Sequence, residues 1–181
     1  MIQIFLIAIG LAMDAFAVSL ACGLNFKKPN WKLALRIGLF FGIFQGGMTL
    51  LGFLLGGQFA NIITKIDHWI AFILLSYIGI KIFLEGFNEE KKHDDFSNKK
   101  LTYLSVATSI DALAVGVSMA LVEKGDVLIS SVIIAIVAYL FSFVGVAIGS
   151  YIGSKYSKYA NFFGGIILFS MGMQILIEGL F

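Results

Sequence analysis

Two aspartates stand in the middle of long apolar stretches of this 181-residue chain, where an ionised side chain is costly and usually functional. Asp14 and Asp111 each lie about ten residues into their stretch, near the centre of a membrane span. Both belong to stripes of small residues that let helix backbones approach closely. The stripes are Gly10, Asp14, Ala17 and Ala21, and Ala107, Asp111, Ala114 and Ser118. The pattern predicts two carboxylates that face one cavity; the alternative is a structural Asp bonded to a neighbouring helix.

Oxygen ligands of this kind select a hard divalent cation such as Mg²⁺, Ca²⁺ or Mn²⁺, because no cluster of His or Cys accompanies them. Gln45 lies at a similar depth, and its side-chain carbonyl could bind a cation or make an interhelical hydrogen bond. Ser and Thr hydroxyls often bond back to their own helix, and the segment from Thr108 to Asp111 favours a local break that exposes carbonyls. The candidate supporting groups are Met13, Thr49, Thr108, Ser109 and Ser118.

The composition predicts a membrane protein to position these groups. Only 13% of the residues are charged and 59% are hydrophobic, which excludes a soluble domain and a disordered chain. A net charge of +2 does not indicate a nucleic-acid partner. The continuous apolar runs predict an all-α, polytopic fold embedded in a lipid bilayer. Six membrane helices are expected, at about residues 4–24, 35–57, 69–87, 101–122, 128–151 and 160–180.

The two halves of the chain resemble each other in three places. Met13 to Val18 corresponds to Ile110 to Val115, and the second and third apolar stretches match the fifth and sixth in the same order. The predicted organisation is a three-helix repeat at 1–87, a charged cytoplasmic linker at 88–100 and a second three-helix repeat at 101–181. Because three is odd, the second repeat enters from the opposite side, as in many secondary transporters that bind substrate at the midplane between repeats.

The distribution of basic residues predicts the orientation. Ten of the 13 Lys and Arg residues follow the first, third and fifth stretches, and two lie on the opposite side, which places both termini outside. Lys81 and Glu85 are one turn apart and are expected to pair at the cytoplasmic interface. Glu178 corresponds to Glu85 in the repeat and is a candidate vestibule residue at the outer surface.

Several motifs together resemble the bacterial manganese efflux pump family over essentially the whole chain. They are Met13-Asp14-Ala15-Phe16-Ala17-Val18-Ser19, Phe41-Gly42-Ile43-Phe44-Gln45, His68-Trp69-Ile70-Ala71-Phe72, Glu85-Gly86-Phe87, and Ala107-Thr108-Ser109-Ile110-Asp111-Ala112-Leu113-Ala114-Val115-Gly116-Val117. The resemblance implies a six-helix exporter of Mn²⁺ in the bacterial plasma membrane. It maps the family's paired membrane aspartates onto Asp14 and Asp111, and a polar second-helix position onto Gln45. Thr49 departs from the family's pattern, which often has a Pro, and with it a kink, at this position.

The sequence therefore predicts a secondary transporter, not an enzyme, that exports Mn²⁺ through a midplane carboxylate site and needs no cofactor besides this substrate. Two carboxylates close together at low dielectric would not both ionise, so one would hold a proton that the metal displaces, and proton antiport is a natural coupling. The alternative is an exporter of another divalent cation, such as Ca²⁺ or Cd²⁺, or of a small cationic solute. The oligomeric state is left open.

Overall fold

The computed structural model describes residues 2–24, 26, 30–85, 97–122 and 126–155, and seven residues between 166 and 177. Side chains within 57–85 are described only for Trp69, Phe72, Ile73, Ser76, Tyr77 and Ile80, and those of 121–122 and 153–155 are not described. The expected linker residues 88–96 lie outside the described part, as do the side chains of Lys81 and Glu85 and all of Glu178.

The described chain is all-α, as predicted. The helices are α1 (Ile2–Leu24), α2 (Trp31–Glu85), α3 (Asn98–Thr108), α4 (Ile110–Val122) and α5 (Val127–Lys155). Among the described residues, α1, the Trp31–Gly56 part of α2, and the Val127–Ile152 part of α5 are long and apolar enough to cross a membrane. The consecutive helices α3 and α4 pass the same test together, as a pair bent by 43°. These features are those of a polytopic membrane protein.

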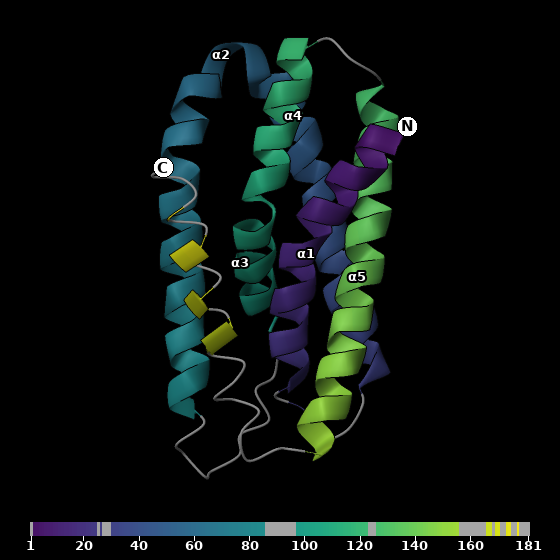
Figure 1. Cartoon of the computed structure of the whole chain (residues 1–181), viewed down its shortest axis with the longest axis vertical. Helices are drawn as coiled ribbons and strands as arrows, with labels where there is room; N and C mark the ends of the chain where they lie inside the picture. Colours follow the sequence, from purple (N-terminus) through teal and green to yellow (C-terminus); the bar gives the residue numbers. More distant parts are fainter. Residues whose placement is uncertain are drawn as a thin grey trace.

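The second and third predicted spans fall within the single helix α2. A straight helix of 55 residues would be about 80 Å long, far more than the roughly 30 Å of a bilayer's hydrocarbon core. The ribbon of α2 rises at the back of the molecule, turns over at the top and descends at the left (Figure 1). The two arms of α2 thus correspond to the two predicted spans.

The sixth predicted span, 160–180, lies largely outside the described residues. The seven residues described there are α-helical: Ile166, Ile167, Phe169, Ser170, Met173, Gln174 and Ile177.

Polar side chains cap the starts of three helices. The Asn30 Oδ1 atom accepts a hydrogen bond from the Leu33 amide at 3.1 Å, at the start of α2. Asp126 Oδ1 accepts a hydrogen bond from the Leu128 amide at 3.0 Å, at the start of α5. Ser97 Oγ accepts from the Lys100 amide at 3.4 Å, so α3 begins at Asn98, and the last three residues of the expected linker are helical.

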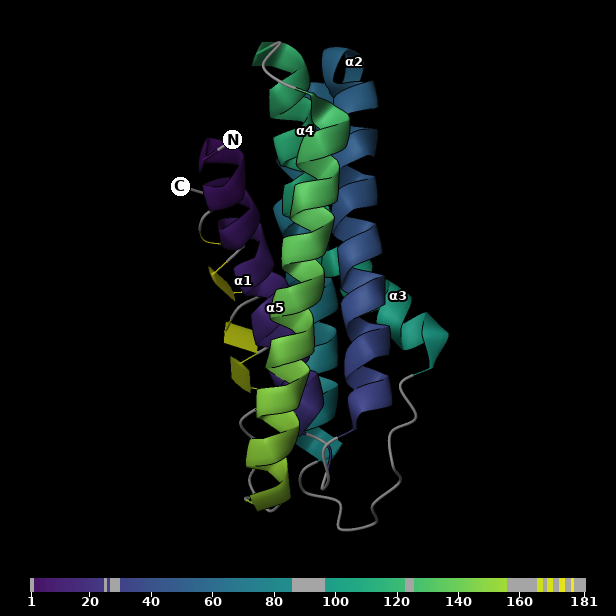
Figure 2. The same ribbon diagram turned by 90° about the vertical axis from the view of Figure 1, so that its right-hand side faces the viewer.

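The largest interfaces join α1 to α5, α2 to α4, and α2 to α5. Helices α1 and α5 lie side by side and run in the same direction (Figures 1 and 2). Large apolar side chains cover the outside of this bundle; Leu54 and Ile43, for example, are 77% and 67% exposed. An apolar outer surface of this kind is what a lipid environment requires.

Two glycines allow the close approach of helices in these interfaces. A Cβ atom added at Gly52 of α2 would overlap the carbonyl oxygen of Leu113 in α4. A Cβ added at Gly145 of α5 would come within 2.7 Å of the carbonyl oxygen of Phe16 in α1. Phe16 and Leu113 occupy corresponding positions in the two sequence motifs, as do Gly52 and Gly145. The same small-residue contact therefore occurs once in each half of the chain.

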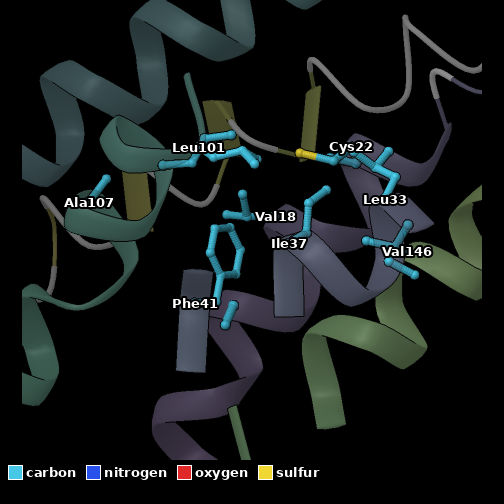
Figure 3. Close-up of a cluster of buried hydrophobic side chains, with 12 residues drawn as sticks. Val18, Cys22, Leu33, Ile37, Phe41, Leu101, Ala107 and Val146 are labelled. Carbon is cyan, nitrogen blue, oxygen red and sulfur yellow. The ribbon is translucent and has the colours of Figure 1, made fainter. Parts of the chain in front are cut away.

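A buried apolar cluster lies where the end of α1 meets the starts of α2 and α3. Val18, Ile37, Phe41 and Leu101 point toward one another at its centre (Figure 3). We call this group the inner cluster, with members Ala15, Val18, Ala21, Cys22, Leu33, Ala34, Ile37, Phe41, Leu101, Leu104, Ala107 and Val146.

Basic residues gather at the end of the bundle beside the inner cluster. Lys32 and Arg36 lie in the first turns of α2, and Lys99 and Lys100 lie in the first turn of α3. The Arg36 guanidinium donates a hydrogen bond to Asn98 Oδ1, which joins the starts of the two helices. We call this end of the bundle the basic end.

The glycine contacts predict a selective loss of stability. Gly52→Ala should lower the free energy of unfolding by about 1–3 kcal/mol, because the new methyl group would overlap the Leu113 carbonyl. The measurement is the thermal unfolding temperature of the protein in detergent. The matched control is Gly47→Ala, since a Cβ at Gly47 meets no atom within 4 Å. Equal unfolding temperatures for the two variants would contradict this packing.

Candidate functional site

The site is organised around the side-chain amide of Gln45, which is fully buried in α2. Its Nε2 atom donates one hydrogen bond to the carbonyl oxygen of Leu11 in α1, at 3.1 Å. It donates a second to the carbonyl oxygen of Thr108 at the end of α3, also at 3.1 Å. One nitrogen thereby holds the two carbonyl oxygens within about 6 Å of each other and joins three helices.

The two bridged carbonyls have the same relation to the two aspartates. Leu11 lies three residues before Asp14, and Thr108 lies three residues before Asp111. In α1 a separation of three residues is close to one helical turn, whereas Thr108 and Asp111 lie on either side of the junction between α3 and α4. Both aspartate side chains are half-buried. The structure thus brings together, at Gln45, the two backbone carbonyls that precede Asp14 and Asp111 by three residues.

The predicted break in the fourth span is present, and it separates α3 from α4 next to Asp111. The Ser109 amide donates to the Val106 carbonyl at 3.2 Å, a tighter turn than the α-helix makes. Ile110 then starts α4, with a 43° change of direction. Asp111 lies in the first turn of α4, where the helix dipole favours a negative charge.

Hydroxyl groups stabilise this break by capping the end of α3. Thr108 Oγ1 donates to the Leu104 carbonyl at 3.1 Å, and Ser109 Oγ donates to the Ser105 carbonyl at 2.6 Å. Thr49 and Ser118 also bond back to their own helices, to the carbonyls of Gln45 and Ala114. All four hydroxyls behave as expected for membrane helices, and each oxygen can still accept a further bond.

The oxygen of the Gln45 side-chain amide accepts no hydrogen bond from the described residues. This oxygen, Oε1, is buried, although both protons of the same amide are used. A buried polar atom without a partner costs free energy unless another ligand satisfies it. A cation bound by side-chain carbonyl oxygen would do so.

Within the described residues, His, Cys, Asp and Glu form no group of three that could hold a metal ion. Any cation at Asp14 and Asp111 would therefore need further oxygens from the amide, the hydroxyls or the backbone. That oxygen-rich donor set suits a hard divalent cation. Met13, the one candidate soft ligand, is 51% exposed.

Sequence reasoning missed the two bridged carbonyls and four buried serine hydroxyls. The Oγ atoms of Ser19, Ser76, Ser105 and Ser142 are buried and have no hydrogen-bond partner in the described part of the chain. Their signal in the sequence is weak, because an isolated Ser in an apolar helix usually bonds to its own backbone. Ser105 could have been found from its position one turn before Thr108.

Comparisons with known proteins match one family over most of the chain. The model of a family described as "Putative manganese efflux pump" matches residues 28–176. The chain is 49% identical to the "Putative manganese efflux pump MntP" of Desulfitobacterium hafniense, over 99% of this chain and 95% of that protein. It is 47% identical to the Acetivibrio thermocellus protein of the same name, over 99% and 91% of the two chains. A Wolinella succinogenes protein, "Putative manganese efflux pump MntP 1", is 45% identical over both full lengths. No solved structure gives a significant match.

The Gln45 bridge predicts a stability effect that a hydroxyl substitution nearby should not reproduce. Gln45→Leu leaves the Leu11 and Thr108 carbonyls without the amide and should lower the free energy of unfolding by about 1–3 kcal/mol. Thr49→Val is the matched control, because it removes only a bond within the same helix. Thermal unfolding in detergent measures both. A Gln45→Leu protein no less stable than Thr49→Val would show that the bridge does not hold the three helices.

Proposed function

This chain belongs to the manganese efflux pump family, and from that premise we propose that it exports Mn²⁺ from the cytoplasm as a secondary transporter. The family is one of transporters and not of enzymes, and its named substrate is a metal ion that needs no further cofactor. The observation that carries the proposal is the Gln45 bridge, since its two carbonyl partners belong to the residues three positions before Asp14 and Asp111.

The proposed binding site contains the carboxylates of Asp14 and Asp111 and the free carbonyl oxygen of the Gln45 amide. Two carboxylates would balance the charge of one divalent cation, and Oε1 would gain the partner that it lacks. Thr49, Thr108, Ser109 and Ser118 supply hydroxyl oxygens nearby, and Met13 supplies a thioether that Mn²⁺ tolerates. Lys81 and Glu85 retain the interfacial role expected from the sequence, and Glu178 that of a vestibule residue.

The proposed architecture is a pair of inverted three-helix repeats, 1–87 and 101–181. Support comes from the contacts of α2 with α4 and of α5 with α1, in which Gly52 faces Leu113 and Gly145 faces Phe16. The next turn repeats the correspondence, because Gly56 faces Val117 and Gly149 faces Leu20. Inverted repeats give a transporter two related conformations that open to opposite sides of the membrane.

The proposed orientation puts the basic end in the cytoplasm of a bacterial cell and both termini outside. Its support is the gathering of Lys32, Arg36, Lys99 and Lys100 at one end, while α1 begins at the other end (Figure 1). The proposed coupling is proton antiport. In an empty site one of the two carboxylates would hold a proton, and Mn²⁺ would displace it.

Uptake into everted membrane vesicles tests the proposal. Asp14→Asn and Asp111→Asn each remove a negative charge and keep the shape of the side chain. Each should lower Mn²⁺ uptake by at least about tenfold, because even residues that only support a metal ligand cause a loss of this size when they are replaced. Vesicles that are acidic inside should lose acid as Mn²⁺ enters. Ca²⁺, Cd²⁺ and a cationic amino acid, added as competitors, decide between Mn²⁺ and the alternative substrates.

The control variant is Asp126→Asn, which changes an exposed aspartate that caps α5 and should keep full uptake. Well-expressed Asp14→Asn protein with unchanged Mn²⁺ uptake would refute the carboxylate site. Stronger competition by Ca²⁺, by Cd²⁺ or by the amino acid than by unlabelled Mn²⁺ would refute Mn²⁺ as the substrate.

A further inference from the structure

The aspartate-bearing face of α1 changes from exposed to buried along its length. Gln3, Ile7 and Gly10 precede Asp14 on this face and are all exposed. A Cβ added at Gly10 would meet nothing within 4 Å. Ala17 is half-buried, and Ala21 is completely buried in the inner cluster. Exposure on this face therefore falls toward the basic end.

On the aspartate-bearing face of α3 and α4, exposure also changes along the helices. Here the buried residues precede the aspartate in the sequence and the exposed residues follow it. Leu104 and Ala107 precede Asp111 and are 0% and 3% exposed, both within the inner cluster. Ala114 follows Asp111 and is half-buried, and Ser118 is exposed. Since α3 and α4 run away from the basic end, exposure again falls toward that end.

Corresponding positions of the two small-residue stripes differ most in exposure at the ends of the stripes. Gly10 corresponds to Ala107, and Ala21 corresponds to Ser118, yet in each pair one residue is exposed and the other is buried. Near the centre, by contrast, Asp14 and Asp111 are both half-buried. The two halves are thus equivalent at the site and unequal on either side of it.

The packing of the two aspartate-bearing segments, α1 and α3–α4, also differs between the two ends of the bundle. Helix α1 contacts α3, whose residues Leu101, Leu104 and Ala107 join it in the inner cluster. Helix α4 packs mainly on α2, and its Ala112 joins Ala8, Leu11 and Ala12 of α1 in a second buried cluster. In Figure 1 the ribbons of α1 and α4 diverge toward the end of the bundle away from the inner cluster.

Resting on the proposed function, we propose that this conformation faces outward: the inner cluster closes the cytoplasmic route, and Mn²⁺ leaves over the exposed residues Gln3, Ile7, Gly10 and Ser118. Water, not lipid, covers this route, because a lipid-covered path to two carboxylates at membrane depth would be costly. In the inward-facing state the difference in exposure between the two ends reverses, so that Ala21 and Ala107 become exposed and Gly10 and Ser118 become buried. The small side chains at these positions let the helices separate or meet without moving bulky groups.

Thiol labelling tests the route independently of transport. Single cysteines at Gly10, Ser118, Ala21 and Ala107, in a Cys22→Ala parent, are treated in right-side-out vesicles with a membrane-impermeant cationic methanethiosulfonate. Without Mn²⁺, Gly10→Cys and Ser118→Cys should react at least about tenfold faster than Ala21→Cys and Ala107→Cys, because only a water-exposed thiol ionises readily.

The control variant is Ile43→Cys, at an exposed position two residues before Gln45 on the outside of α2. It should not react, since lipid covers it. If a cysteine at Ala107 prevents folding, Ile7→Cys and Leu104→Cys provide an equivalent pair, with wild-type residues 43% and 0% exposed.

The outcomes separate this proposal from the proposed function, because Mn²⁺ uptake by the parent is measured alongside. Rapid labelling at Gly10 and Ser118 supports the outward route even if the parent transports no Mn²⁺. Labelling there no faster than at Ile43 shows a lipid-covered face and overturns the route, even if Mn²⁺ uptake is normal. Faster labelling at Ala21 and Ala107 also overturns it.

Discussion

The two hydrogen bonds donated by the Gln45 amide join three helices at one buried point. They connect a helix of the first half to the broken span of the second half through backbone carbonyls, which no substitution can remove. Their positions relative to Asp14 and Asp111 are the same in both halves. A shift of either helix along its axis would break one of these bonds, so the bridge keeps the Leu11 and Thr108 carbonyls side by side.

Close packing of helices accompanies this bridge. Small residues bring neighbouring helices together, with Gly52 of α2 against Leu113 of α4 and Gly145 of α5 against Phe16 of α1. In a membrane, association of this kind depends on van der Waals contact and interhelical hydrogen bonds, since lipid gives little hydrophobic driving force. The inner cluster fills the basic end, while Gln3, Ile7, Gly10 and Ser118 are exposed toward the other end of the two aspartate-bearing helices.

The sequence predicted much of this arrangement from residue type and spacing. Asp14 and Asp111 were identifiable because charged groups rarely occur within apolar stretches, and the hydroxyls of Thr108 and Ser109 indicated the break in the fourth span. The partners of Gln45 were not predictable, because backbone carbonyls leave no trace in residue identity. The sequence also could not predict which end of the aspartate-bearing helices is exposed. The four residues that differ in exposure are all small, so the sequence pattern is the same in either case: Gly10, Ala21, Ala107 and Ser118.

The central claim is that a divalent cation binds between the two aspartates beside the Gln45 amide. Anomalous X-ray scattering from crystals soaked in Mn²⁺ tests it most directly, because the signal locates manganese without reference to the fold. The account predicts a peak about 2–2.5 Å from carboxylate oxygens of both Asp14 and Asp111, the distance usual for hard cations with oxygen ligands. A peak elsewhere in the membrane span, with none at this pair, would contradict the account.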